Sequence, residues 1–349
     1  MTRALLIDRD WPAGVGPGTS LLGLALLRRQ ILAAEHAGFE RIFVEPVDGV
    51  DLSPHLARTR AQIASSAGAL FREEPIVRLP ARLLPNVEWL RGLRENRPPV
   101  PSPSQAAPFE INGSQDLPRA ERWLLSGLVK DTEGFLSRHV ERKISLAISR
   151  RLAATGITPN AMTVVSLAVG LAGAAFFLSS RPAMQFLGAL LFLAHSILDG
   201  CDGELARLKF QVSRFGGVLD FWGDNVVHSA VFAAIALGWW SASRQLAPLF
   251  LGAAAIAGTL LSAGFVYFQT MREPREGPLF TSVSRSGDSR FSRLADALAR
   301  RDFIYLVVVL AAFGKAHWFL ILAAVGAPAF FFVLVGLALG QRHPRRSYS

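Results

Sequence analysis

Four aspartates in two pairs are the residues of this sequence whose types and spacing could do chemistry. Asp199 and Asp202 are three residues apart, and Asp220 and Asp224 are four residues apart. Residues at these spacings share one face of a helix, so both acids of a pair can point in the same direction. A short connection between two such helices would bring all four carboxylates into one small volume.

A cluster of four carboxylates requires a compensating positive charge. Carboxylates packed together without a partner repel one another, and burying them is costly. Oxygen ligands are those that hard divalent cations such as Mg²⁺ or Mn²⁺ prefer. We therefore expect the four aspartates to hold a metal ion. Salt bridges between the acids and basic residues of the connection would account for only two of the aspartates. They would not account for the glycines that lie nearby. These glycines are Gly200, Gly203, Gly216, Gly217 and Gly223.

The helices that carry these acids are expected to cross a membrane. The chain has 349 residues, of which 51% are hydrophobic, and its mean hydropathy is positive. From Ile157 to Gly340, long apolar runs alternate with short charged connections. With their flanking residues, the runs are long enough to cross a hydrocarbon core of about 30 Å. The six predicted spans are 159–180, 183–206, 214–240, 246–271, 302–316 and 318–340.

The charged connections predict the orientation of these spans. Those that follow spans two, four and six hold thirteen Arg or Lys residues, whereas the opposite connections hold three. Basic connections remain on the cytoplasmic side, so both termini are expected to be cytoplasmic. We expect an integral protein of the cell (inner) membrane, without a cleavable signal peptide. The net charge of +10 then indicates an anionic membrane surface or substrate, and not nucleic acid.

Residues 1–115 are predicted to form a small cytosolic α/β domain. Short buried strands are expected at Ala4–Ile7 and Arg41–Val44, with a helix over Leu21–His36 between them. The glycine-rich turn at 13–19 has the composition of a phosphate-binding loop, although a plain tight turn has the same composition. The proline-rich stretch at 97–103 is expected to be a loop or linker.

Residues 116–156 are predicted to form a linker and an amphipathic helix. From Phe135 to Leu152, apolar residues recur every four positions and basic residues occupy the other faces. This pattern is typical of a helix that lies in the membrane interface against anionic headgroups, and also of a docked surface helix. The position directly before the first span favours the interfacial helix.

The acids and their neighbours resemble the signature of the CDP-alcohol phosphotransferase (CDP-alcohol phosphatidyltransferase) family. In that pattern, two residues separate the first two aspartates, and a glycine directly follows the second aspartate. Two further residues lead to an Ala-Arg pair. Eight residues then separate the arginine from a second glycine, which two more aspartates follow at intervals of four residues. The positions that match are Asp199, Asp202, Gly203, Ala206, Arg207, Gly216, Asp220 and Asp224. The resemblance extends from about Ala120 to Gly340.

This resemblance implies a six-helix membrane enzyme with a defined reaction. It would transfer a substituted phosphate group from a CDP-linked donor, CDP-diacylglycerol or a CDP-alcohol, to an alcohol acceptor and release CMP. The resemblance implies that Asp199, Asp202 and Asp220 hold the metal, and that Asp224 is the general base beside it and a fourth metal contact. The implied substrate contacts are Gly203, Ala206, Arg207, Gly216 and Asn160.

The N-terminal region resembles the cytidylyltransferase domain of bifunctional inositol-phosphate synthases, with one departure. Such domains carry an Arg and a Lys after the glycine-rich loop, where this sequence has Thr19-Ser20-Leu21. A degenerate domain with a structural or regulatory role is therefore expected. The basic run from Arg272 to Arg301 suits either a phosphorylated acceptor or an ordinary cytoplasmic loop.

Two other functions suit a membrane protein with intramembrane acids. One is a carrier, because buried acids also mark transport routes, and the other is an inactive scaffold of the same fold. The acids cluster at one end of two spans, which favours a surface-facing enzyme site. The expected partners are the donor, the acceptor and membrane lipids, and a second copy of the chain, as a homodimer, is a further candidate.

Overall fold

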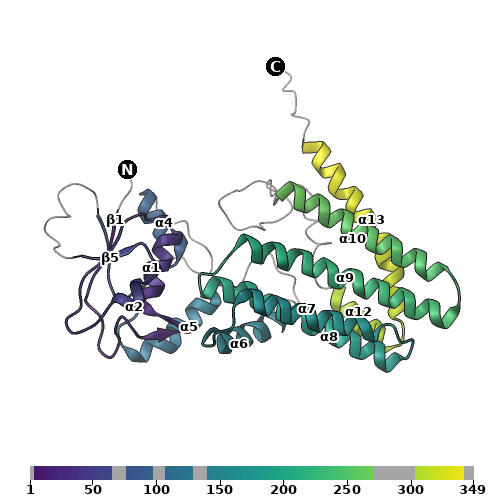
Figure 1. Cartoon of the computed structure of the whole chain (residues 1–349), viewed down its shortest axis with the longest axis horizontal. Coiled ribbons are helices and arrows are strands. Elements are labelled where there is room, and N and C mark those ends of the chain that lie inside the picture. The colour runs from purple at the N-terminus through teal and green to yellow at the C-terminus, as the bar shows by residue number, and fades with distance from the viewer. Residues whose placement is uncertain (1–3, 65–75, 97–106, 129–139, 271–302, 342–349) are drawn as a thin grey trace, which may run out of the picture. The chain divides into compact units, whose positions relative to one another are not determined.

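The computed structural model describes residues 4–64, 76–96, 107–128, 140–270 and 303–341 (Figure 1). The chain divides into two compact units. The first unit contains the N-terminal residues to Lys130 together with two short segments, Arg150–Gly156 and Arg207–Gln211. The second unit contains the remaining residues, which include most of the long helices.

A parallel four-stranded sheet forms the centre of the first unit. Its strand order is β5-β4-β1-β6. The bounds of the strands are β1 Ala4–Ile7, β4 Ile42–Val44, β5 Ala61–Ile63 and β6 Ile76–Leu79. In β1, Leu5 and Ile7 belong to a cluster with residues of helix α1 (Leu26–His36), whereas Ala4 and Leu6 belong to a separate cluster. Both faces of the sheet are therefore covered, as in α/β proteins with parallel strands.

The predicted strand at Ala4–Ile7 is confirmed, and the second strand begins one residue later than expected, at Ile42. The predicted helix at Leu21–His36 begins only at Leu26. Residues Ser20–Leu21 (β2) instead pair with Leu24–Ala25 (β3) in a small hairpin, which Gly23 closes with a φ of +77°. The remaining elements of this unit are α2 Ser53–Leu56, β7 Leu83–Leu84, α4 Val87–Glu95, β8 Phe109–Glu110, a 3-10 turn Ser114–Asp116 and α5 Leu117–Ser126.

The second unit is helical. Its elements are α6 Arg142–Ala153, α7 Pro159–Phe176, α8 Pro182–Leu208, α9 Arg214–Ser243, α10 Ala247–Thr270, α12 Phe303–Ala312 and α13 Ala316–Gln341, of which α6 and α8 extend into the first unit by their last residues. Side-chain caps begin two of them. Thr158 Oγ1 accepts from the Ala161 amide at 3.2 Å before α7, and Ser213 Oγ accepts from the Gly216 amide at 3.0 Å before α9.

Within the described residues, five helices are long and apolar enough to cross a membrane: α7, α8, α9, α10 and α13. They correspond to five of the six predicted spans. The sixth, 302–316, contains the ten-residue helix α12, which is about 15 Å long at 1.5 Å per residue. Gly314 follows this helix with a left-handed φ of +66°. By itself α12 is therefore shorter than a membrane span.

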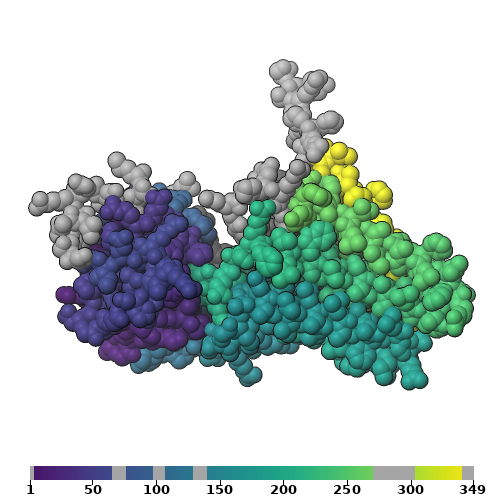
Figure 2. All heavy atoms as spheres, viewed as in Figure 1, coloured from purple at the N-terminus to yellow at the C-terminus, as the bar shows by residue number. Residues whose placement is uncertain are grey.

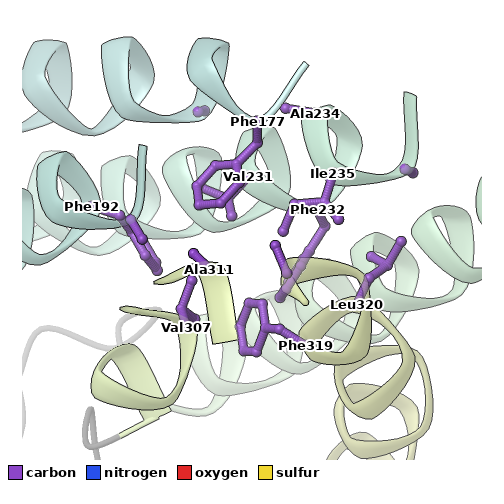
Figure 3. Close-up of a cluster of buried hydrophobic side chains, with 14 of the residues drawn as sticks. Phe177, Phe192, Val231, Phe232, Ala234, Ile235, Val307, Ala311, Phe319 and Leu320 are labelled. Atoms are coloured by element: carbon purple, nitrogen blue, oxygen red, sulfur yellow. The ribbon is translucent and has the colours of Figure 1, made fainter. Parts of the chain in front are cut away.

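Aromatic and branched side chains form the core of the helical unit. Phe177, Phe192, Val231 and Phe319 are buried in one cluster, shown in Figure 3. Val307 of α12 joins the same cluster, so this short helix is packed into the bundle. Helix α10 packs against both α9 and α13, and α9 also packs against α7 (Figure 1).

The outer surface of the helices is apolar. In the five long helices, between 17% and 39% of the residues in the most apolar stretch are buried inside the protein. Large side chains such as Phe250 of α10 and Phe332 of α13 are 72% and 70% exposed, and α10 lies at the surface in Figure 2. A surface of this kind is stable in lipid, so the chain is an integral membrane protein.

Candidate metal centre

Helices α8 and α9 bring three of the four predicted acids together. Asp199, Asp220 and Asp224 each offer one carboxylate oxygen, and these oxygens lie within 4.8 Å of one another. Asp199 is buried on α8, and the two α9 acids, which lie one turn apart, are half-buried. The four-residue spacing thus places both α9 acids on the face that meets Asp199.

The fourth acid, Asp202, lies beside this group of three and has a partner on another helix. Its Oδ2 accepts a hydrogen bond from Thr163 Oγ1 of α7 at 2.5 Å. Asp202 also interacts electrostatically with Asp199 and Asp224. The hydroxyl of Thr163 therefore orients one carboxylate oxygen of Asp202, and α7 becomes the third helix that shapes the site.

A buried histidine, His195 of α8, faces Asp224. Its Nε2 lies 3.4 Å from Asp224 Oδ1, and its Nδ1 lies 2.9 Å from the carbonyl oxygen of Ser166 on α7. A carbonyl oxygen can only accept, so Nδ1 carries a hydrogen and the ring orientation is set by α7. The sequence prediction did not include His195, although its position four residues before Asp199 indicates the same helix face.

The donor set fits a hard divalent cation. All atoms that the three acids present are carboxylate oxygens, the ligands that Mg²⁺ and Mn²⁺ prefer. The Oδ1 atom of Asp220 is buried and has no hydrogen-bond donor within the described residues. A buried carboxylate oxygen without a donor is costly, and a bound cation would remove that cost.

Two of the predicted substrate contacts are neighbours. A Cβ atom added to Gly216, in the first turn of α9, would lie 2.8 Å from Oδ1 of Asn160, in the first turn of α7. The absence of a side chain at Gly216 thus makes room for the Asn160 amide. The other predicted contacts lie in the last turns of α8, after Asp202: Gly203, Ala206 and Arg207.

Two further residues near the site contribute to packing. The His228 ring packs against Phe192 and Phe303, with ring centroids 5.5 and 5.7 Å apart. The glycine at 223 allows close helix contact, because a Cβ there would lie 2.6 Å from Leu167 of α7. Small residues of this kind let membrane helices pack closely against their neighbours.

The fold and the site define a polytopic membrane protein with a carboxylate centre shared by two spanning helices. Residues 156–284 match the family model of CDP-alcohol phosphatidyltransferase. The acid-bearing part of the chain is therefore similar to this family, as its signature predicted. All eight signature positions lie within the matched residues.

Several curated proteins are similar to the same part of the chain. The bifunctional IPC transferase and DIPP synthase of Thermococcus kodakarensis is 39% identical over 128 residues, which are 36% of this chain and 28% of the relative. The protein of the same name from Rubrobacter xylanophilus is 34% identical over 189 residues, or 53% of this chain and 41% of the relative. The chain therefore spans less than half the length of these relatives.

Shorter relatives are also similar. The phosphatidylinositol phosphate synthase of Mycobacteroides abscessus is 34% identical over 121 residues, which cover 33% of this chain and 54% of the relative. The crystal structure of Mycobacterium tuberculosis phosphatidylinositol phosphate synthase with CDP-DAG bound aligns over 58% of this chain and 92% of its own. Its sequence identity is 21% and its TM-score is 0.36.

Proposed function

We propose that this protein transfers a substituted phosphate group from a CDP-linked donor to an alcohol acceptor and releases CMP. The observation that carries the proposal is the convergence of Asp199, Asp220 and Asp224, within 4.8 Å, inside the residues that match the family. The names of the relatives favour an acceptor of the inositol-phosphate class. Either CDP-diacylglycerol or a CDP-alcohol would serve as the donor.

The acids have separate roles in this proposal. Asp199, Asp202 and Asp220 would hold Mg²⁺ or Mn²⁺, with one oxygen of Asp202 oriented by Thr163. Asp224, whose carboxylate oxygen lies within 4.8 Å of those of Asp199 and Asp220, would adjoin the cation as the general base. Such a cation, when bound, neutralises charge on the diphosphate of the donor. The protein's own contribution is to fix the acids on two packed helices, so that little rearrangement is needed when the donor binds.

Asp224 is the proposed general base. In the reaction, the acceptor hydroxyl oxygen forms a bond to the phosphorus that carries the donor's substituent, and the bond from that phosphorus to CMP breaks. The hydroxyl proton passes to a carboxylate oxygen of Asp224. His195, with its Nε2 3.4 Å from Asp224 Oδ1, limits the directions in which that carboxylate can point.

Gly203, Ala206, Gly216 and Asn160 are the proposed neighbours of the nucleotide, together with Arg207. Small residues in α8 leave room for a ligand beside Asp202, and the Asn160 amide lies at the first turn of α9. An amide offers both a donor and an acceptor, so it is suited to a polar group of the nucleotide.

The test is a screen for CMP release by the purified chain in lipid nanodiscs. Donors would include CDP-diacylglycerol and several CDP-alcohols, each combined with inositol phosphate, glycerol phosphate or inositol, with and without Mg²⁺. We expect release from at least one pair, dependent on the metal and abolished by a chelator. Absence of release from every pair, or release that persists in the chelator, would overturn the proposal.

A further inference from the structure

Helix α6 has an unusual distribution of side chains. Two of its three buried positions are polar, Ser145 and Ser149, and the third, Ala153, is its last residue; the preceding residue Glu141 is buried as well. The apolar residues Val140 and Ile144 are instead 45% and 43% exposed. A helix docked on a soluble protein has the reverse arrangement, with its apolar face inward. Polar contacts therefore contribute to holding the first two turns of α6 in place.

The strongest of these contacts is a buried ion pair with α8. Glu204 is completely buried, and its Oε1 accepts hydrogen bonds from Arg142 Nη1 at 2.6 Å and from Ser145 Oγ at 2.7 Å. The Arg142 side chain is 16% exposed. A charge-assisted hydrogen bond of this length, between groups mostly removed from water, fixes the geometry of both partners.

Side chains of α6 also lie against Gly200 of α8, close to this pair. A Cβ atom added to Gly200 of α8 would lie 3.5 Å from Arg142 Nη1 and 3.7 Å from Ser145 Cβ. One helical turn earlier, Ser196 Oγ lies 3.5 Å from Glu141 Oε2. Residues 196, 200 and 204 are spaced by four, so they form one continuous stripe of α8 that contacts the α6 region.

The stripe that contacts α6 is adjacent to the stripe that forms the candidate metal centre. Asp199 directly precedes Gly200, and Asp202 lies two residues before Glu204. A rotation or shift of α8 that altered the contact with α6 would therefore move both acids. The contact with α6 and the position of the acids are coupled through a single rigid helix.

We infer that Arg142 and Glu204 are positioning residues, which lock α6 onto α8 and thereby set the orientation of Asp199 and Asp202 for metal and donor binding. The inference rests on the proposed function and extends it to two residues outside the acid cluster. Neither residue needs to contact the substrate. Lipid on the outer face of α6, against Val140 and Ile144, would complete the packing of this helix.

Variants of the full chain in nanodiscs test this inference. Arg142→Met removes the cation and leaves the Glu204 carboxylate without its charged partner, and Arg142→Lys keeps the charge. Arg142→Met combined with Glu204→Gln removes both charges. Lys143→Met is the matched control, because it removes one positive charge from an exposed position of the same helix.

Three measurements are made on each variant: amide hydrogen exchange in residues 142–149, Mn²⁺ affinity by electron paramagnetic resonance, and kcat and KM for CMP release. For Arg142→Met we expect exchange to rise at least tenfold, Mn²⁺ affinity to fall at least fivefold and kcat/KM to fall at least tenfold. Arg142→Lys and the double variant should recover part of each loss, and Lys143→Met should stay within twofold of the parent. Unchanged exchange in α9 would show that the bundle remains folded.

Mn²⁺ affinity separates the two proposals. Unchanged exchange in α6, or looser α6 with unchanged Mn²⁺ affinity, overturns the positioning role even if the parent releases CMP. A parent that binds Mn²⁺ but releases no CMP contradicts the proposed function, and the affinity of Arg142→Met then still decides the positioning role. A parent that binds no Mn²⁺ overturns both.

Discussion

At the scale of single residues, the three converging acids predict that replacing one of them by alanine weakens metal binding. Asp220→Ala and Asp199→Ala each remove one of the three oxygen donors that lie within 4.8 Å. We expect Mn²⁺ affinity to fall at least tenfold and CMP release to fall below detection, because a hard cation needs several carboxylate ligands. Asp48→Asn, at an exposed acid of the first unit, is the control and should change neither.

Asp224 and Asp202 should respond differently to the same substitution. Asp224→Asn keeps the size of the side chain but removes the base, so we expect turnover to fall by about 10²–10⁴-fold while much of the donor affinity remains. Asp202→Asn removes a charge next to Asp199 and should weaken donor binding itself. Calorimetric titration of both variants with a CDP-linked donor and Mg²⁺ checks this. Equal losses of donor affinity would contradict a separate role for Asp224.

At the scale of elements, α1 contains a buried arginine whose loss should destabilise the first unit. Arg29 is 2% exposed and donates to the carbonyl oxygens of Leu21 at 2.8 Å and Leu208 at 2.9 Å. Burial lowers the pKa of its guanidinium to about 10, so it remains protonated at neutral pH. Arg29→Met leaves buried carbonyl groups without donors, which we expect to cost about 1–3 kcal/mol.

Thermal unfolding of the full chain measures this loss of stability, with hydrogen exchange in the sheet of the first unit as the readout. The control is Arg28→Met, one position earlier, where the guanidinium donates to the carbonyl oxygens of His55 and Ala57 in partly exposed surroundings. A larger loss of stability in the control than in Arg29→Met would contradict the explanation based on burial.

At the scale of the whole molecule, the basic connections predict the topology. We expect a cysteine label in the 272–301 connection, and a reporter fused after Ser349, to be accessible only from the cytoplasmic side. Labels near Arg244 or Lys315 should be accessible from the opposite side. Cys201 is buried, so it does not interfere with labelling of intact membranes. A label in the 272–301 connection that reacts from outside would contradict the six-span topology.

At the scale of the whole molecule, the glycine-rich turn also leads to a prediction about the activity of the N-terminal region. The amide of Gly16 in the glycine-rich turn donates to Thr19 Oγ1 at 2.8 Å, and the Thr19 amide donates to the Gly16 carbonyl at 3.0 Å. Both amides are therefore used within the turn, and residues 13–21 contain no Arg or Lys to bind a triphosphate. We expect the full chain to release no pyrophosphate from CTP with any polyol phosphate. Release of pyrophosphate would restore a bifunctional enzyme.

The sequence by itself determined the features that depend on neighbours along the chain. The spacing of the four acids placed them on the right helix faces, because helical periodicity is local. The same holds for the starts of α7 and α9, where Thr158 and Ser213 act as caps, and for the apolar runs of the five long helices. The match of residues 156–284 to a known family follows from the same local pattern.

Only the tertiary structure decided which distant side chains meet. It placed Asp202 against Thr163, His195 against Asp224, and Arg142 against Glu204, pairs that lie 29 to 62 residues apart in the chain. No local pattern predicts these contacts, because they require helix backbones to approach at particular points, as Gly173 and Gly188 allow between α7 and α8. The hairpin at Ser20–Ala25 is a further case, because its turn glycine, Gly23, lies against the carbonyl oxygen of Ala153, where an added Cβ atom would be only 1.9 Å away.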